Sequence, residues 1–287
     1  MFFINISDVR EFFGAYKCEL LTTSEVNKEL IKEFESIKPN DDLQKYIRSE
    51  KRAWTDDLNG ETRVYLIKDE VGNIACYFSI KCGLLVGEDL NEKLADDEKE
   101  LLDLYVNAKK DKDEEAEKGF YDAINSMFPE KADDIFKIAL KRIERKTEAL
   151  EINQSESTIN VPLCYSAIEV KHLCRNARYV IPNEIKVPVG FGLFWEKIVP
   201  LIEEISNKIG CKYVYIFAAD DVKKETDKDI QKLVRHYKND LKFSECGEGL
   251  KLIKPDYDNY CYGLVQEISK LKNNRESVWE EFSDVWS

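Results

Sequence analysis

The stretch from Ala167 to Asp221 reads AIEVKHLCRN (residues 167–176), a spacer, VGFGLFWEKIVPLIEEISNKIG (residues 189–210) and CKYVYIFAADD (residues 211–221). Residues 167–173 are β-branched and half-alternating, which is typical of a strand. The glycines at 190 and 192 let the backbone turn without hindrance from a Cβ atom. The stretch therefore predicts a strand, a glycine turn, a helix and a second strand.

The helix is predicted because apolar residues recur at helical spacing; they are Phe194, Ile198, Leu201, Ile205 and Ile209. We expect Pro200 to kink this helix and Gly210 to end it. Residues 213–219 form a nearly unbroken apolar run, which is typical of a strand covered on both faces. The strand, the glycine turn, the helix and the second strand together predict a right-handed crossover between parallel strands.

The glycine turn has two interpretations. A turn at a helix N-terminus offers free backbone N–H groups and the positive end of the helix dipole, so it suits a phosphate or pyrophosphate. In many such turns, however, glycine serves only the backbone geometry. The pattern alone leaves both interpretations open.

This order of elements, followed by LVRHYKNDLKF (residues 233–243), resembles the GNAT superfamily of acetyl-CoA-dependent N-acyltransferases. In that family the turn is usually written Q/R-x-x-G-x-G/A, and its amides hold the coenzyme A pyrophosphate. Gly190 and Gly192 match the two glycines, whereas Val187 stands where the family has Gln or Arg. The resemblance covers most of the chain outside one insertion and is most specific between Glu169 and Phe243.

The resemblance implies an α/β (α+β) fold: a mixed, mostly antiparallel sheet with splayed central strands, flanked by helices. It also implies acetyl-CoA or coenzyme A as the acyl donor, with pantetheine pairing to a strand edge and the pyrophosphate at the glycine turn. The residues that it assigns to cofactor binding are Leu173, Cys174, Val187, Val189, Gly190, Phe191 and Gly192.

Two catalytic roles follow from the same resemblance. Glu169 is the candidate base, since some members carry a carboxylate on this strand; a salt-bridged strand residue or a water chain are the alternatives. Tyr237 is the candidate general acid for the departing thiolate, with one more residue before Phe243 than the common Y-x-x-x-x-F spacing. Its helical spacing also fits simple packing. Asp220 and Asp221 could bind a cationic acceptor or cap the strand end.

Composition limits the other function classes. A net charge of −13 argues against nucleic-acid binding, and no run of 18 apolar residues could span a membrane. The start of the chain lacks a secretory pattern, so we expect a cytoplasmic protein. The eight scattered cysteines are predicted to be free thiols, and two histidines are too few for a histidine-rich metal site, so no metal is expected.

The remaining chain predicts one elaborated domain over residues 1–287. We expect a strand at Phe2–Ile6, helices capped by Ser24 and Asp41, and a hairpin of residues 63–67 and 74–85. Residues 86–160 form an acidic helical insertion, either a decorative subdomain or a functional lid; residues 86–160 hold 21 Asp and Glu against 12 Lys and Arg. A helix over 226–241, a final strand near 259–268 and a small C-terminal helix follow.

The sequence favours an N-acetyltransferase that transfers the acetyl group of acetyl-CoA to a primary amine on a small molecule or a protein. The alternative is a weak or inactive GNAT-fold module that binds acyl-CoA, because Val187 replaces the usual Gln or Arg. Acylation of charged tRNA, known in relatives of this family, is disfavoured by the net charge. Both a monomer and a homo-oligomer remain open.

Overall fold

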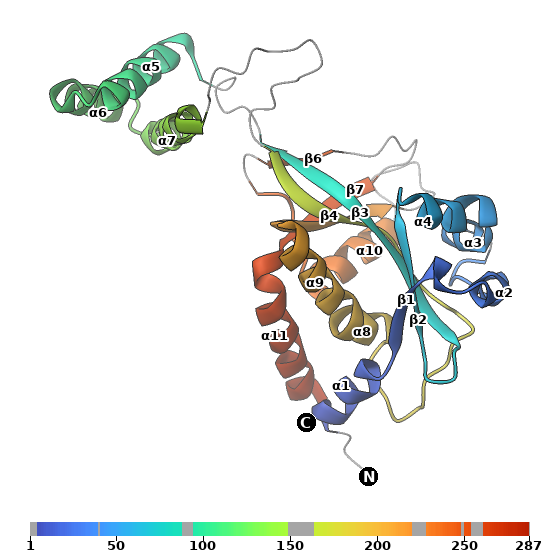
Figure 1. Ribbon diagram of the computed structural model, residues 1–287. Helices are drawn as coiled ribbons and strands as arrows, with labels where there is room; N and C mark the ends of the chain where they lie inside the picture. Colours follow the sequence, from blue (N-terminus) through green and yellow to red (C-terminus); the bar gives the residue numbers. More distant parts are fainter. Residues whose placement is uncertain are drawn as a thin grey trace. The chain divides into compact units, whose positions relative to one another are not determined.

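The structure is a computed structural model that describes residues 5–39, 41–87, 94–148, 164–219, 228–247, 250–253 and 261–286 (Figure 1). The chain divides into two compact units. The sheet unit comprises Met1–Leu85 and Cys164–Ser287, and the helical unit comprises Val86–Leu163. Asp220, Asp221 and Phe2, which the sequence singles out, lie outside the described residues.

Within the described residues, the sheet unit contains a seven-stranded sheet in the order β1-β2-β3-β4-β5-β7, with β6 paired to β3. The β1–β2, β2–β3 and β5–β7 pairs are antiparallel, whereas β4 and β5 are parallel. This arrangement confirms the expected mixed, mostly antiparallel sheet. The strands are β1 Lys17–Leu20, β2 Arg63–Lys68, β3 Ile74–Gly87, β4 Cys164–Arg175, β5 Tyr213–Ala219, β6 Leu250–Leu252 and β7 Cys261–Glu267.

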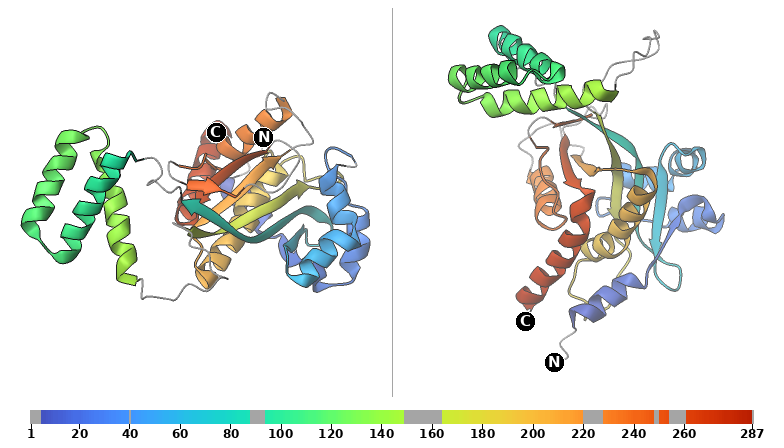
Figure 2. Two further views of the ribbon diagram at one scale, coloured as in Figure 1. Left: turned by 90° about the horizontal axis from the view of Figure 1, so that it is seen from above. Right: turned by 60° about the vertical axis from the view of Figure 1, so that its left-hand side comes forward.

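One face of the sheet carries the large core, which contains the apolar sides of α1, α8 to α10 and α11. Figure 2 shows α9 and α11 running beside each other on this face. The bounds are α1 Ile6–Gly14, α8 Val189–Leu193, the π-helix η4 Phe194–Ile198, α9 Val199–Ile209, α10 Lys228–Asn239 and α11 Ile268–Trp286. The helix predicted between the parallel strands is thus confirmed.

Two smaller apolar clusters lie apart from this core. The first joins β2 and β3 to short helices: the 3-10 helix η1 Leu21–Thr23, α2 Val26–Lys32, α3 Asp42–Arg48 and the π-helix η2 Glu50–Trp54. The helix α4 Thr55–Asn59 follows η2 directly. The second contains Leu85, Ala167, Tyr213, Tyr215 and Val265, with β6 residues packed against it. They are called the helix-covered cluster and the β6-covered cluster below.

The predicted strand at Phe2–Ile6 is wrong at its described end, because Ile6 begins α1. The Asn5 side chain accepts a hydrogen bond from the Ser7 N–H at 3.2 Å and so satisfies one of the unpaired amides of the first turn. Val9 and Phe13, one helical turn apart, bury the inner face of this helix. The local cap and the 3.6-residue period outweigh the strand preference of the opening residues.

The crossover helix runs from Val189 to Ile209, with the π-helix η4 interrupting it directly before Pro200. Pro200 has no N–H to donate to the preceding turn, and its ring crowds a carbonyl there, so that turn widens. The helix ends at Gly210, whose φ of +67° is the left-handed conformation that glycine adopts without strain. The end at Gly210 is thus confirmed, and the irregular turn lies directly before Pro200.

β4 contains one extra residue relative to β3. The Ser79 Oγ lies 2.7 Å from the His172 Nδ1, and the Lys81 Nζ lies 3.3 Å from a Glu169 oxygen. These cross-strand contacts are two residues apart on β3 and three apart on β4, which is the count of a β-bulge between Glu169 and His172. The pairing of β4 with β5 ends at Val170 and Ile216, beside the bulge. The two parallel strands therefore separate there, as the expected splay requires.

The helical unit has an apolar core of its own. α5 Asp96–Asp111, α6 Glu114–Met127 and α7 Ala132–Glu148 enclose it, and Leu102, Ile124 and Ile135 lie fully buried inside. A single short helix could not bury such a face alone, but three helices together can. The unit fits the helical character expected for residues 86–160.

Candidate functional site

The unpaired end of β4 carries the two positions expected to face pantetheine. Leu173 packs partly against the large core, and Cys174 is buried in the helix-covered cluster. Burial raises the pKa of the Cys174 thiol to about 12, so this sulfur stays protonated and is a poor nucleophile near neutral pH. Beyond Val170 the strand has no paired β5 residue, so its backbone edge at 171–175 faces away from β5 partners.

Tyr237 lies on α10 and is buried, with 7% of its surface exposed. Burial and the nearby Cys174 thiol both raise the pKa of its phenol, which therefore remains protonated at neutral pH. Among the described residues its hydroxyl makes no hydrogen bond, while its carbonyl accepts the Phe243 N–H at 3.0 Å. The expected general acid thus lies on α10 in the large core, within electrostatic reach of Cys174, one of the expected donor-binding residues.

The start of α8 combines an uncapped end with close packing. No side chain caps this helix, and Val187, Val189 and Phe191 are buried in the large core. A Cβ at Gly190 would meet nothing within 4 Å, whereas a Cβ at Gly192 would lie 2.3 Å from the Phe13 ring. Gly190 thus leaves open space at the helix start, and Gly192 allows α8 to approach α1.

Glu169 lies inside the sheet and is 4% exposed. Its carboxylate accepts a hydrogen bond from the Tyr215 hydroxyl at 3.1 Å and forms the ion pair with Lys81. Burial and this carboxylate raise the pKa of the Tyr215 phenol, so the hydroxyl remains a donor. Glu169 is therefore both salt-bridged and placed one residue before the point where β4 and β5 separate.

His172 lies on β4 in a polar and aromatic environment. Besides Ser79, it contacts the Tyr46 ring, which stacks on the imidazole with ring centroids 4.0 Å apart. The Tyr46 hydroxyl in turn donates to Asp56 at 2.9 Å. The polar alternation of Ser79 and Lys81 within an otherwise apolar strand is the sequence signal that marks this region.

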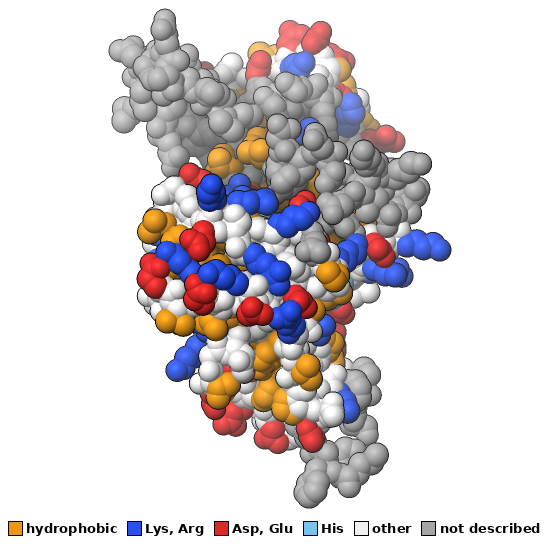
Figure 3. Space-filling model, turned by 90° about the vertical axis from the view of Figure 1, so that its right-hand side faces the viewer, with side chains coloured by type: hydrophobic (Ala, Val, Ile, Leu, Met, Phe, Trp, Pro, Cys, Tyr) orange, Lys and Arg blue, Asp and Glu red, His pale blue; other side chains and the backbone are white. Residues whose placement is uncertain are grey.

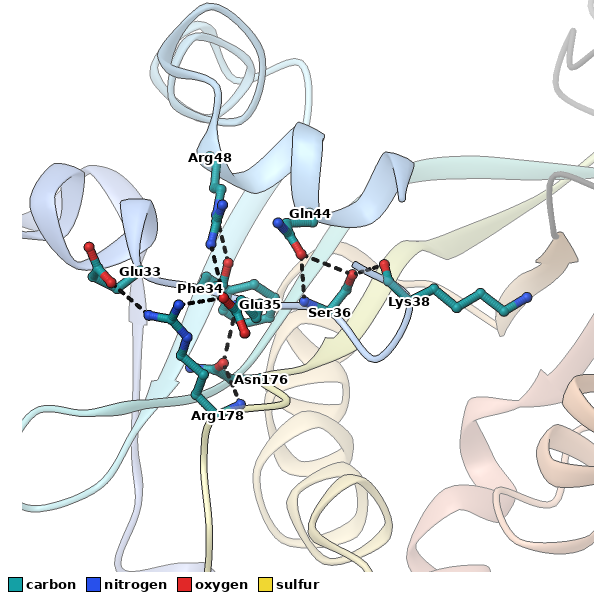
Figure 4. Close-up of polar contacts among 9 residues, drawn as sticks. All are labelled: Glu33, Phe34, Glu35, Ser36, Lys38, Gln44, Arg48, Asn176 and Arg178. Atoms are coloured by element: carbon teal, nitrogen blue, oxygen red, sulfur yellow. Dashed lines mark hydrogen bonds and ion pairs between the residues drawn. The ribbon is translucent and has the colours of Figure 1, made fainter. Parts of the chain in front are cut away.

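A polar network holds the chain where it leaves β4 (Figure 4). The Asn176 side chain accepts from the Glu35 N–H at 3.2 Å and donates to the Ile74 carbonyl at 2.8 Å. Arg178 forms ion pairs with Glu33 and Glu35, and Arg48 donates to the Phe34 carbonyl at 2.7 Å. The segment after α2 thereby fixes the end of β4, which carries Leu173 and Cys174.

Within the described ranges, no group of three or more His, Cys, Asp or Glu residues could hold a metal ion. The eight cysteines are free thiols. The described helices are also all too short or too polar to cross a bilayer.

The mixed sheet, with one parallel pair between antiparallel pairs, agrees with the fold that the sequence resemblance implies. No family model and no curated protein matches the chain. Among solved structures, a bacterial toxin is 10% identical, with a TM-score of 0.46 over 91% of this chain and 94% of its own.

Two further structures are similar at the same level. A mutant of the AtaT toxin is 8% identical, with a TM-score of 0.43 over 96% of this chain and 98% of its own. A mutant of KacT is 9% identical, with a TM-score of 0.42 over 91% of this chain and 99% of its own.

Proposed function

We propose that the protein is an acetyl-CoA-dependent N-acetyltransferase that acts on a primary amine. The observation that carries this proposal is the separation of β4 from β5 next to Tyr237. That opening offers an unpaired strand edge at residues 171–175 and a protonated phenol beside Cys174. An extended pantetheine chain can pair with such an edge, and a phenol can supply a proton to a leaving thiolate.

The residues present also fit a diphosphate. The open space at Gly190 lets a phosphate approach the backbone, and the first turn of α8 has no side-chain cap to compete for its amides. Anions are stabilised at such a helix start by the amides and the dipole together. Val187 adds no charge there, so the amides would carry the binding.

When bound, acetyl-CoA supplies the acetyl group and departs as the free thiol. In this proposal Glu169 accepts the proton of the attacking amine, directly or through water, and Tyr237 protonates the sulfur. The backbone amides at the bulge polarise the acyl carbonyl, because the backbone there is released from the regular ladder. The acceptor is held next to Glu169.

The second candidate is a GNAT-fold module that binds acyl-CoA without turnover. The buried Val187 favours it, because a Gln or Arg at this position would reach toward phosphate and a valine packed in the core does not. Turnover separates the two candidates. A protein that binds the donor but releases no thiol with any amine would be the module.

The test is calorimetry with acetyl-CoA, followed by detection of free thiol with three separate acceptor classes: small amines, protein amines and aminoacyl-tRNA. Gly190→Val should weaken donor binding at least tenfold, because the branched side chain fills the approach to the amides. Gly119→Val is the matched control, since Gly119 is also helical with nothing within 4 Å. No binding of acetyl-CoA at millimolar concentration would refute both candidates.

A further inference from the structure

Four polar residues lie together on the sheet face opposite the large core. Ser79 and Lys81 come from β3, and Glu169 and His172 come from β4. They lie between the helix-covered cluster, which contains Cys174, and the β6-covered cluster, which contains Ala167. We call these four residues the polar strip. Polar groups are costly between two apolar clusters, so their place at the strand opening calls for a reason.

Contacts within the protein occupy only some of the hydrogen-bonding groups of the polar strip. The Ser79 hydroxyl forms a hydrogen bond with the Nδ1 atom of His172, but the Nε2 atom makes no hydrogen bond within the described part of the chain. The Lys81 side chain is 36% exposed, so its ammonium group has donors beyond the contact with Glu169. The strip thus has an imidazole nitrogen and an ammonium group available to a ligand.

Three basic side chains lie within electrostatic reach of the imidazole. Burial lowers the pKa of His172 to about 3, and Lys171, Arg52 and Lys81 lower it further, so the ring is neutral. Arg52 lies over the Tyr46 ring, 5.5 Å from its centroid, and Tyr46 stacks on His172. Figure 3 shows Lys and Arg side chains, mixed with Asp and Glu, across the side of the molecule that carries α2 to α4. Three cations near a neutral ring favour an anionic group of a ligand.

We infer that the polar strip is the acceptor subsite and that it takes amines which also carry an anionic group, a carboxylate or a phosphate. The anionic group lies near Lys81, Arg52 and the imidazole, and the amine lies at Glu169. The amine is then one residue from the strand opening, where the acetyl group is proposed to lie. This inference rests on the proposed function for the reaction, but amine binding tests it separately.

The transfer balances in this arrangement. The amine nitrogen bonds to the acyl carbon as the carbon–sulfur bond breaks. One proton leaves the nitrogen toward Glu169 or its water, and the sulfur takes one from Tyr237. The products are an amide that keeps its anionic group and a free thiol.

The experiment compares pairs of amines by calorimetry, with coenzyme A present. O-phosphoethanolamine is compared with ethanolamine for phosphate, and 4-aminobutyrate with butylamine for carboxylate. At least one anionic probe should bind about 10- to 100-fold more tightly than its neutral counterpart, the size of a charge-assisted contact. The pair that shows the difference identifies the anionic group.

Lys81→Met should remove this preference, and Lys81→Arg should retain most of it. Lys208→Met is the matched control, because Lys208 is an exposed helical lysine paired with Glu204. Equal affinity of both anionic probes and their neutral counterparts in the wild type would overturn the inference, even if acetyl-CoA binds and turns over. A preference that survives in a folded Lys81→Met protein would overturn the role of Lys81.

Discussion

Tyr237 is buried in the large core, and its hydroxyl makes no hydrogen bond to another described residue, so its removal separates chemistry from packing. Tyr237→Phe keeps the ring and should change the free energy of unfolding by less than about 1 kcal/mol. Turnover should fall by about 10² to 10⁴, the usual size of general acid catalysis. The turnover rate is measured from the release of free thiol. Calorimetry should show that the affinity for acetyl-CoA is unchanged. A variant with wild-type turnover would remove Tyr237 from the mechanism.

His172 makes stability depend on pH. Its pKa is about 3 in the folded protein, against an ordinary value near 6.5, so between these pH values the unfolded chain binds the extra proton. Stability from this group is present above pH 6.5 and is lost as the pH falls toward 3, by about 1.4 kcal/mol per pH unit.

The measurement is urea unfolding of the wild type and His172→Gln between pH 7 and 4.5. The difference in slope of unfolding free energy against pH isolates this group from the carboxylates, which are shared by both proteins. His236→Gln is the control, because that histidine is exposed and pairs with Asp240, directly after the end of α10. Identical slopes for the wild type and His172→Gln would show that the imidazole is not buried and neutral.

At the scale of elements, one carboxylate joins three helices. Glu196 of η4 accepts from Arg10 of α1 at 3.1 Å and from Trp279 of α11 at 2.7 Å, and it also pairs with Arg275. Glu196→Ala removes the acceptor of Arg275 and Trp279, while Arg10 keeps its ion pair with Glu276, and should cost about 3 kcal/mol of unfolding free energy. Glu204→Ala removes an exposed pair on the same helical run and should cost less than about 1 kcal/mol. If denaturant unfolding gave the same loss of unfolding free energy for both variants, Glu196 would not join the three helices.

The crossover from β4 to β5 is predictable from sequence because its signals are local: helical spacing, an apolar strand, and a glycine in the left-handed region at 210. The role of Gly192 is not, because the Phe13 ring that it accommodates comes from a helix 179 residues earlier. The polar strip was missed for the same reason. Its contacts join side chains of β3 to side chains of β4, and the residues of the helical unit separate these two strands in the sequence. Which side chains meet also depends on the bulge in β4, which no local sequence pattern reveals.

At the scale of the whole molecule, the two units should fold independently. The sheet unit and the helical unit have separate apolar cores, and β3 and β4, which flank the helical unit in sequence, are neighbours in one sheet. Replacing residues 88–163 by a short Gly/Ser bridge should therefore leave a folded protein that binds acetyl-CoA with unchanged affinity. Calorimetric scanning should show that one transition of the full chain disappears. The preference for anionic amines should persist, because the polar strip lies in the sheet unit.

A truncated chain that does not fold would show instead that the inserted helices complete the core of the sheet. An altered preference among amines in a folded truncated chain would assign the helical unit to acceptor selection. The intact chain with Gly119→Val serves as the reference for a change confined to the helical unit.

The bulge in β4 also determines how the strand would respond to the insertion or deletion of one residue. An insertion or deletion of one residue usually turns every later side chain of a strand to the opposite face. In β4 the extra residue is absorbed between Glu169 and His172, so the strand already holds two registers, one on each side. Losing that residue would turn His172 and Cys174 toward the large core. The deletion of one codon would thus move an imidazole and a thiol from one face of the sheet to the other.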